Sequence, residues 1–174
     1  SVVRPAFVVG TGRSGSTVLG KVLSMHRGVA FLDEPKAMWY TLVTEEDVNG
    51  HFSDGPARYR LGAEDASSQI RDRAHRLFGA YLLMTGSRHI LDKNPEHVFR
   101  IPFVRAIFPD ARFVLLVRNG WDTVASIVGW SRRNRSVSKG RVDDWWGRNR
   151  RKWQLMAAQL VPDEPLLADR APEV

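Results

Sequence analysis

The 174-residue sequence lacks cysteine. It therefore offers no disulfide, no thiolate ligand for a metal and no thiol nucleophile, and this absence favours a reducing, cytoplasmic location. No apolar run approaches the roughly 20 residues that a bilayer-spanning helix needs, so we expect no membrane span. The start of the chain does not look like a secretory signal, because Arg4 and Pro5 interrupt its short apolar run. Internal repeats and low-complexity tracts are also lacking.

What remains is the composition of an ordinary globular protein, with 43% hydrophobic and 26% charged residues. A chain of this length can bury the core of one α/β domain but not comfortably the cores of two. We therefore expect a single domain over residues 1–174.

Positive charge is concentrated in residues 131–152. Nine basic and two acidic residues give this stretch a net charge of +7, which equals that of the whole chain. Such a stretch can steer an anionic ligand or an acidic acceptor toward one side of the molecule, or it can be a solvated basic face. Both interpretations stay open. The basic residues are Arg132, Arg133, Arg135, Lys139, Arg141, Arg148, Arg150, Arg151 and Lys152.

Apolar runs of strand type alternate with segments of helical period. This alternation is typical of βαβ units, and it predicts an α/β fold with a parallel sheet flanked by helices on both faces. The expected strands are Phe7–Val9, Val29–Leu32, His89–Asp92 and Arg112–Val117. The expected helices are Thr17–Met25, a helix capped by Ser67 or Ser68 and closed by Gly86, two short pieces after Pro95 that Pro102 separates, and a helix through residues 123–128.

Other segments have weaker patterns. In the first helix, an apolar stripe is expected at Val18, Leu19, Val22 and Leu23. Residues 36–64 have no sustained period, so we expect a loop-rich insertion with short helical pieces. Near the end, four apolar residues have the spacing of one helical face, and an extended tail should follow from residue 161. These four are Trp146, Trp153, Met156 and Leu160.

A glycine-rich segment follows the first expected strand. The first turn of a helix leaves backbone N–H groups without partners and carries partial positive charge. Glycines let the preceding backbone curl, so that these N–H groups can surround a phosphate. We therefore interpret residues 10–17 as a phosphate-binding loop. Its glycines are Gly10, Gly12 and Gly15, its cation is Arg13, and its hydroxyl donors are Ser14, Ser16 and Thr17.

Two known patterns overlap in this loop. Gly10-x-Gly12-x-x-Gly15 satisfies the dinucleotide fingerprint, and Asp33 and Glu34 lie about where its ribose-binding acid belongs. The same residues satisfy the nucleotide-triphosphate loop, except that Ser16 replaces the lysine that reaches the β- and γ-phosphates. The loop alone therefore predicts a phosphate without identifying the ligand.

A charged residue follows each of the four expected strands: Arg13, Glu34, Lys93 and Arg118 in chain order. Because the carboxyl ends of parallel strands meet at one edge of a sheet, we expect these side chains to lie close together. Ser126 comes eight residues after Arg118, about two turns into the next helix. Two arginines, a lysine and several hydroxyls indicate a ligand with more than one phosphate group.

This set of residues resembles the sulfotransferases that use 3′-phosphoadenosine-5′-phosphosulfate (PAPS), especially the branch with the tyrosylprotein sulfotransferases and their bacterial relatives. Residues 7–23 resemble the 5′-phosphosulfate loop of that family, G-x-x-R-S-G-[ST]-T, and Asp33-Glu34-Pro35 follows it. Residues 91–128 resemble a K-x-P element and then F-P-[DN]-A-[RK]-F-[IV]-x-x-[VL]-R-[DN]-x-x-[DA]-x-x-x-S, the 3′-phosphate site. The order and spacing of these elements make the resemblance more specific than either loop pattern.

The resemblance implies a role for each residue. Arg13 and the segment Gly12, Ser14, Gly15, Ser16 and Thr17 would hold the 5′-phosphosulfate, and Arg118 and Ser126 the 3′-phosphate. Glu34 would be the general base for the acceptor, and Lys93 would assist the leaving oxygen together with Arg13. PAPS would be the sulfuryl donor, adenosine 3′,5′-bisphosphate the product, and no metal would be needed. Asn119 and Trp121 depart from the family pattern, and such domains are usually longer, so part of the C-terminal third is expected to be missing.

Two other functions compete with this interpretation. A P-loop nucleotide phosphotransferase should keep the loop lysine and a Mg²⁺-binding acid, and a non-enzymatic polyanion or nucleic-acid binder would use Arg132–Lys152. We expect no specific nucleic-acid partner. The acceptor remains open among sugars, lipids, peptide tyrosine and small metabolites, with a hint of an acidic one, and the oligomeric state cannot be inferred from the sequence.

Overall fold

The computed structural model describes residues 2–138 and 140–161. The chain divides into two compact units. The first comprises the described residues up to Val43 together with Leu61–Arg118, and the second comprises Thr44–Arg60 and the described residues from Asn119 onward. Whether both units form one domain over residues 1–174 stays a prediction. Of the expected tail, residues 162–174 lie outside the described residues.

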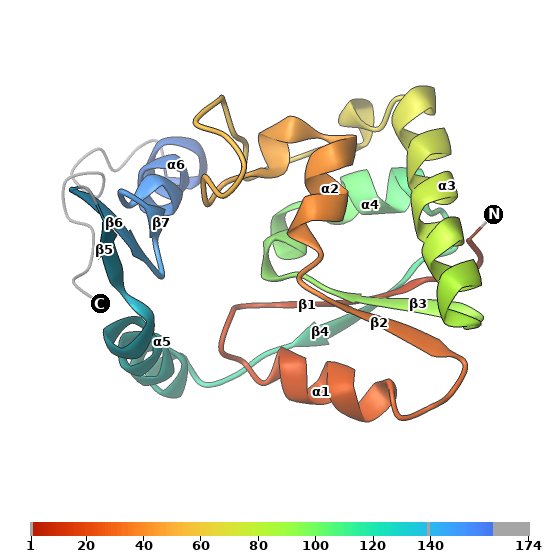
Figure 1. Ribbon diagram of the computed structural model, residues 1–174, viewed down its shortest axis with the longest axis horizontal. Coiled ribbons are helices and arrows are strands. Elements are labelled where there is room, and N and C mark those ends of the chain that lie inside the picture. The colour runs from red at the N-terminus through yellow and green to blue at the C-terminus, as the bar shows by residue number, and fades with distance from the viewer. Residues whose placement is uncertain (1, 139, 162–174) are drawn as a thin grey trace. The chain divides into compact units, whose positions relative to one another are not determined.

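The first unit is built on a sheet of four parallel strands in the order β2–β3–β1–β4 (Figure 1). Their bounds are Ala6–Gly10 for β1, Val29–Asp33 for β2, His89–Lys93 for β3 and Arg112–Leu116 for β4. The predicted parallel strands are confirmed. In the β2–β3 register Asp33 is the partner of Lys93, and in the β1–β4 register Gly10 is the partner of Leu116. All four carboxyl ends therefore lie at one edge of the sheet.

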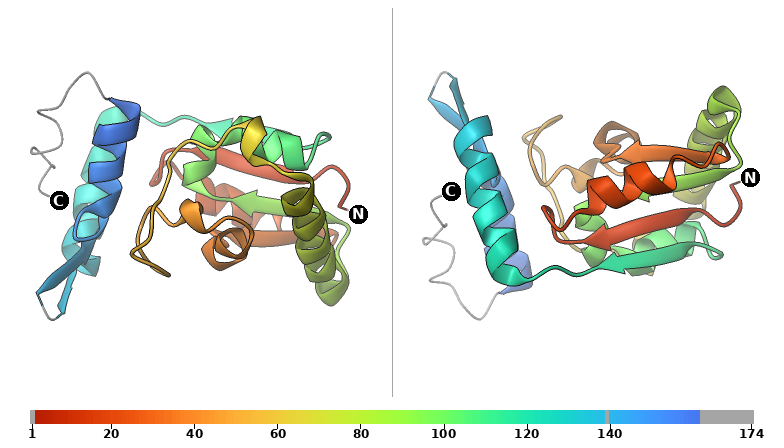
Figure 2. Two further views of the ribbon diagram at one scale, coloured as in Figure 1. Left: turned by 90° about the horizontal axis from the view of Figure 1, so that it is seen from above. Right: turned by 90° about the horizontal axis from the view of Figure 1, so that it is seen from below.

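Helices cover both faces of this sheet, as predicted. Helix α1 (Ser16–Leu23) lies on one face, and α2 (Lys36–Leu42), α3 (Ser68–Thr85) and α4 (Ile101–Ile107) lie on the other (Figure 2). The hydrophobic core fills the space between the sheet and this second layer. Phe7 of β1 is buried at its centre, with its ring 6.5 Å from Trp39 of α2 and 6.0 Å from Phe108.

Polar residues and proline set the helix ends largely where the sequence predicts them. The Ser67 hydroxyl accepts a hydrogen bond from the Ile70 N–H at the start of α3, and Gly86 ends this helix with φ 64°. The Asn94 side chain caps the 3₁₀ helix η3 (Pro95–Phe99), and α4 then begins one residue after Arg100. Pro102 sits in the first turn of α4, where its missing N–H costs nothing. The two expected short pieces are therefore confirmed.

Helix α1 differs from the prediction. It ends at Leu23 instead of Met25, and its apolar stripe is not buried, since Val18 is 66% and Val22 57% exposed. The helix instead approaches the sheet through Gly20, because a Cβ at this position would lie only 2.3 Å from the Phe31 ring. The helix therefore contacts the sheet through Gly20 and not through the expected apolar stripe. A pattern of apolar side chains cannot predict such a contact, because glycine has no side chain.

The second unit contains α5 (Gly120–Asn134), α6 (Arg151–Leu160), the 3₁₀ helix η1 (Thr44–Glu46) and a small antiparallel sheet. The strands are β5 (Ser136–Ser138), β6 (Arg141–Asp144) and β7 (Gly147–Arg148). Residues 36–64 contain only short helices, α2, η1 and the start of η2 (Ala63–Asp65), so the predicted loop-rich insertion is confirmed. Gln159 of α6 holds this insertion, because it accepts from the Tyr59 N–H at 2.8 Å and donates to the Ala57 carbonyl at 2.9 Å.

The helical face predicted near the end of the chain is wrong for Trp146. Helix α6 begins only at Arg151, and Trp146 lies in the turn between β6 and β7. Its ring still packs against Trp153, with the ring centroids 5.0 Å apart. The intervening sheet was not predicted, because strands of two to four residues are too short to produce an alternating pattern.

Candidate functional site

The loop between β1 and α1 has the backbone shape that its glycines predict. Gly10 has φ 153°, and a Cβ there would lie 2.3 Å from the Leu116 carbonyl oxygen, so the loop leaves the sheet pressed against β4. Gly15 has φ 97° and caps α1 without any side-chain hydrogen bond. The first N–H groups of α1 therefore face the loop with no side-chain cap to satisfy them.

Ser14 supplies a second reason to place a ligand at this loop. Its side-chain oxygen is buried and has no hydrogen-bond partner within the described part of the chain. Buried hydroxyls in native proteins are nearly always hydrogen-bonded. Space is available beside it, since a Cβ on Gly15 would meet only the Leu116 side chain, at 4.0 Å. The loop thus fits an anion that accepts hydrogen bonds from the serine hydroxyl and backbone N–H groups.

Arg13 and Arg118 lie close together, although 105 residues separate them in the chain. The Arg118 guanidinium donates to the Arg13 carbonyl at 2.9 Å. Arg13 itself has φ 66°, a left-handed conformation that is unusual for a residue other than glycine. Such outliers cluster at functional sites, and this one lies where the Arg118 guanidinium meets the loop.

Glu34 and Lys93 also meet at the strand edge. The Lys93 Nζ lies 2.6 Å from Glu34 Oε1, and the Lys93 side chain is only 4% exposed. The backbone joins the two residues as well, because the Glu34 N–H donates to the Lys93 carbonyl at 2.8 Å. Glu34 has φ 52°, so it is a second left-handed residue at this edge. Lys93 therefore holds Glu34 both at its backbone N–H and at its carboxylate.

Two further charged residues belong to this cluster: Asp33, which the sequence offered only as a ribose-binding acid of the dinucleotide pattern, and Lys36, for which it predicted no role. Asp33 Oδ1 lies 2.7 Å from Lys93 Nζ, and Lys36 Nζ lies 3.6 Å from Glu34 Oε2 and 3.7 Å from Glu96 Oε1. Both lie within two residues of Glu34 in the segment Asp33-Glu34-Pro35-Lys36. Their closeness to Glu34 in the sequence was the one feature that could have indicated a place in the site. What the sequence does not reveal is the strand register that sets Asp33 beside Lys93.

A buried hydrogen bond joins α2, which begins just after Glu34, to β3, which carries Lys93. The Trp39 indole N–H of α2 donates to Asp92 Oδ2 at 2.8 Å, and both residues are buried. Asp92 directly precedes Lys93 in β3, so this bond ties α2, which starts two residues after Glu34, to the strand that carries the lysine. The Glu34–Lys93 pair is thus held by a packed framework.

The structure brings together four of the predicted residues in two pairs, all in the first unit. The Glu34 and Lys93 side chains meet directly, whereas the Arg118 side chain meets the Arg13 backbone. Ser126 lies in α5 of the second unit, so its predicted pairing with Arg118 stays a prediction. Within the described ranges, no group of three or more His, Cys, Asp or Glu side chains is placed to hold a metal ion. No helix among these residues is both long and apolar enough to cross a bilayer.

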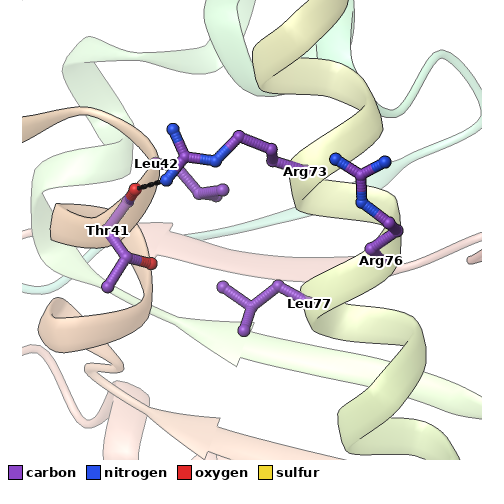
Figure 3. A pocket seen from close by; sticks show the side chains of 5 residues that line it. All are labelled: Thr41, Leu42, Arg73, Arg76 and Leu77. Carbon is purple, nitrogen blue, oxygen red and sulfur yellow. Dashed lines mark hydrogen bonds between the residues drawn. The ribbon is translucent and has the colours of Figure 1, made fainter.

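A separate hollow of about 420 Å³ opens between α2 and α3 (Figure 3). Thr41, Leu42, Arg73, Arg76 and Leu77 line it, and the Arg73 guanidinium donates to the Thr41 carbonyl across it. None of the predicted site residues borders this hollow. It therefore belongs to the helix layer and not to the cluster at the strand edge.

Comparison with known proteins gives consistent matches. A model described as the sulfotransferase family matches residues 5–173. The nodulation protein NoeE of Sinorhizobium fredii is 29% identical over 129 residues, which are 70% of this chain and 30% of NoeE. Protein-tyrosine sulfotransferase 1 of Danio rerio is 24% identical over 125 residues, which are 70% of this chain and 34% of that protein. The matches thus span about a third of the length of these curated relatives.

Among solved structures, sulfotransferase STF1 from Mycobacterium tuberculosis H37Rv aligns with a TM-score of 0.41 and 18% sequence identity. The alignment covers 74% of this chain and 48% of that one.

Proposed function

The chain belongs to the sulfotransferase family, a family of transferases, and we propose that it transfers the sulfuryl group of PAPS to a hydroxyl or amine of an acceptor. The observation that carries this proposal is the Glu34–Lys93 pair, 2.6 Å apart at the strand edge from which the glycine loop also leaves. A carboxylate and a lysine in contact can serve the two ends of one transfer, the proton of the acceptor and the charge of the leaving group.

In the proposed reaction, Glu34 takes the proton of the acceptor hydroxyl as the acceptor oxygen bonds to sulfur. The bond between sulfur and the bridging oxygen breaks on the opposite side, and its electron pair leaves with the phosphate of adenosine 3′,5′-bisphosphate. Lys93 and Arg13 stabilise the negative charge that grows on this phosphate. Before Glu34 Oε1 can take the acceptor proton it must separate from Lys93 Nζ, which lies 2.6 Å away.

The loop from Gly12 to Thr17 holds the 5′-phosphosulfate in this proposal. The support is the Ser14 hydroxyl, which lacks a protein partner among the described residues, and the uncapped start of α1. Arg13 adds a cation next to them. The remaining hydroxyls, Ser16 and Thr17, come from the first turn of α1, where hydrogen-bond donors to an anion are most effective.

Arg118 and Ser126 hold the 3′-phosphate, by resemblance to the family pattern. Arg118 must then exchange its hydrogen bond to the Arg13 carbonyl for bonds to phosphate, which are stronger because both groups are charged. No divalent metal takes part in this proposal, and a cytoplasmic location, favoured by the lack of cysteine, also stays a prediction.

The acceptor is a matter for experiment. Several relatives, that of Danio rerio among them, carry the name protein-tyrosine sulfotransferase, so a tyrosine peptide with acidic neighbours is one acceptor to test, beside sugars, lipids and small hydroxylated metabolites. An acidic acceptor would also suit the positive charge of residues 131–152.

Calorimetric titration with adenosine 3′,5′-bisphosphate, followed by an acceptor screen with labelled PAPS, tests the proposal. We expect saturable binding of the bisphosphate without added metal, and transfer of label to at least one acceptor class. Binding of ATP or NAD in its place, or ATP hydrolysis that depends on Mg²⁺, would overturn the proposal. The Arg13→Ala variant should weaken binding of the bisphosphate. Arg71→Ala is its matched control, because Arg71 is an exposed arginine of α3 far along the chain from the loop.

A further inference from the structure

Lys93 lies between two carboxylates. Its Nζ is 2.6 Å from Glu34 Oε1 and 2.7 Å from Asp33 Oδ1, while its side chain is only 4% exposed. The mechanism proposed above uses one of these carboxylates, Glu34, as the base. It gives no task to Asp33.

The two carboxylates are held differently. Asp33 is the last residue of β2 and is the register partner of Lys93, so the sheet fixes its backbone beside the lysine. Glu34 lies beyond the strand, in a left-handed conformation, and its second oxygen lies 3.6 Å from Lys36. Asp33 is therefore the fixed partner of Lys93, and Glu34 is the partner with a second cation to which it can turn.

The proposed reaction requires Glu34 to leave Lys93. Because Lys93 Nζ occupies Glu34 Oε1 at 2.6 Å, the acceptor hydroxyl must replace this contact. If Glu34 were the sole carboxylate beside Lys93, its departure would leave a nearly buried ammonium group with only the donor phosphate to compensate it and none before the donor binds, which is unfavourable. A second carboxylate at 2.7 Å removes that obstacle.

We propose that Asp33 is a positioning residue that anchors Lys93 at the strand edge while Glu34 serves the acceptor. This inference rests on the proposed function, because it assigns Asp33 a role in the same reaction. In this role Asp33 acts through Lys93, whose Nζ it contacts at 2.7 Å.

The test is a cycle of variants that remove charge and keep size. Asp33→Asn should lower kcat about tenfold to a hundredfold, as expected for a misplaced catalytic group, with the affinity for adenosine 3′,5′-bisphosphate changed less than about twofold. In a Lys93→Met background, Asp33→Asn should have no further effect on kcat. An equal loss of kcat in both backgrounds would show a merely structural role and overturn the inference.

A second measurement does not depend on turnover. In protein labelled with ¹⁵N at lysine Nζ, the Lys93 ammonium signal, assigned by its loss in Lys93→Met, should persist in wild type and in Glu34→Gln. It should disappear through fast exchange with water in Asp33→Asn. A signal that persists in Asp33→Asn overturns the anchor role. If wild type transfers no sulfuryl group from PAPS, the proposed function fails, and the signal still decides whether Asp33 anchors Lys93.

Asp72→Asn is the matched control. Asp72 is an exposed carboxylate of α3, so this variant makes the same chemical change away from the strand edge. It should leave both kcat and the Lys93 signal unchanged. A loss of kcat in Asp72→Asn equal to that in Asp33→Asn would trace the effect to net charge and count against the anchor.

Discussion

Glu34 combines a left-handed backbone, with φ 52°, and a side chain held by Lys93. The Glu34→Gln variant keeps the shape of the side chain and removes its ability to take a proton. Because general-base catalysis typically contributes about 10²–10⁴-fold, we expect kcat to fall at least a hundredfold. The affinity for adenosine 3′,5′-bisphosphate should stay within about threefold, because in the proposed reaction Glu34 serves the acceptor and not the nucleotide. Steady-state kinetics and calorimetry measure the two effects, and equal losses in both would argue against the assigned role.

Arg13 allows the strain of the loop to be separated from its charge. Its φ of 66° is disfavoured for every residue with a Cβ. Arg13→Gly and Arg13→Ala both remove the guanidinium, so each should weaken bisphosphate binding by about 1.5–3 kcal/mol, the range for a hydrogen bond to a charged group. Only glycine relieves the backbone, and Arg13→Gly should be about 1 kcal/mol more stable than Arg13→Ala.

Urea unfolding of the two Arg13 variants measures the difference in stability, and calorimetry measures the difference in binding. Equal stabilities would mean that the loop relaxes when arginine is removed, and that the left-handed conformation depends on the side chain.

At the scale of single elements, the contact of α1 with the sheet can be tested with two glycines. A Cβ at Gly20 would lie 2.3 Å from the Phe31 ring, whereas a Cβ at Gly79 of α3 would meet nothing within 4 Å. Gly20→Ala should therefore lower the free energy of unfolding by about 1–3 kcal/mol through overpacking. Gly79→Ala, the matched control, should raise it by about 0.5–1 kcal/mol through helix propensity. Two changes of the same sign would refute the close approach of α1.

The loop after η1 depends on Asp47. Burial raises the pKa of this carboxyl, but the N–H groups of Phe52, Ser53 and His51 hold the pKa below its ordinary value. These hydrogen bonds are 2.7, 3.0 and 2.9 Å long. A lowered folded-state pKa stabilises the protein above the unfolded pKa of about 3.9, and this stabilisation disappears as the pH falls through the folded-state pKa.

Asp47→Asn should therefore lower the free energy of unfolding at pH 7 by about 1–2 kcal/mol. The gap to wild type should shrink below about pH 4, where wild type itself loses the charge. Urea unfolding at pH 7 and at successively lower pH measures the gap. A difference that does not change with pH would assign the effect to packing.

The elements show what the sequence could predict. Each of the four parallel strands was found to within one residue at either end, because each centres on a short run of apolar residues. The order of the strands was not predicted, since it depends on contacts between distant segments. The same limit hid the pairing of Asp33 with Lys93, which follows from the register of β2 and β3. The buried side of α1 was missed because Gly20 packs through its lack of a side chain.

At the scale of the whole molecule, positive charge had suggested a polyanion binder as an alternative. Part of the basic stretch has local tasks within the second unit. Arg151 donates to the carbonyls of Asp54 and Gly55, Arg148 lies 3.8 Å from Asp54, and Lys152 lies over the Trp145 ring at 4.9 Å. These residues support the packing of residues 44–60 and the small sheet, so fewer of the basic side chains are available to a polyanion.

Ligand-induced stabilisation tests the donor site on the whole molecule. A ligand that binds only the folded state at one hundred times its Kd stabilises it by about 2.7 kcal/mol. For a chain of this size, that corresponds to a rise in Tm of about 5–10 °C. We expect adenosine 3′,5′-bisphosphate to produce this rise in wild type and in Arg71→Ala, and to produce little of it in Arg13→Ala at the same concentration. The rise should also shrink in high salt, because exposed cations such as Arg13 are screened. A polyanion binder that uses residues 132–152 would instead keep its full response in Arg13→Ala, and that result would move the functional site from the glycine loop to the basic stretch.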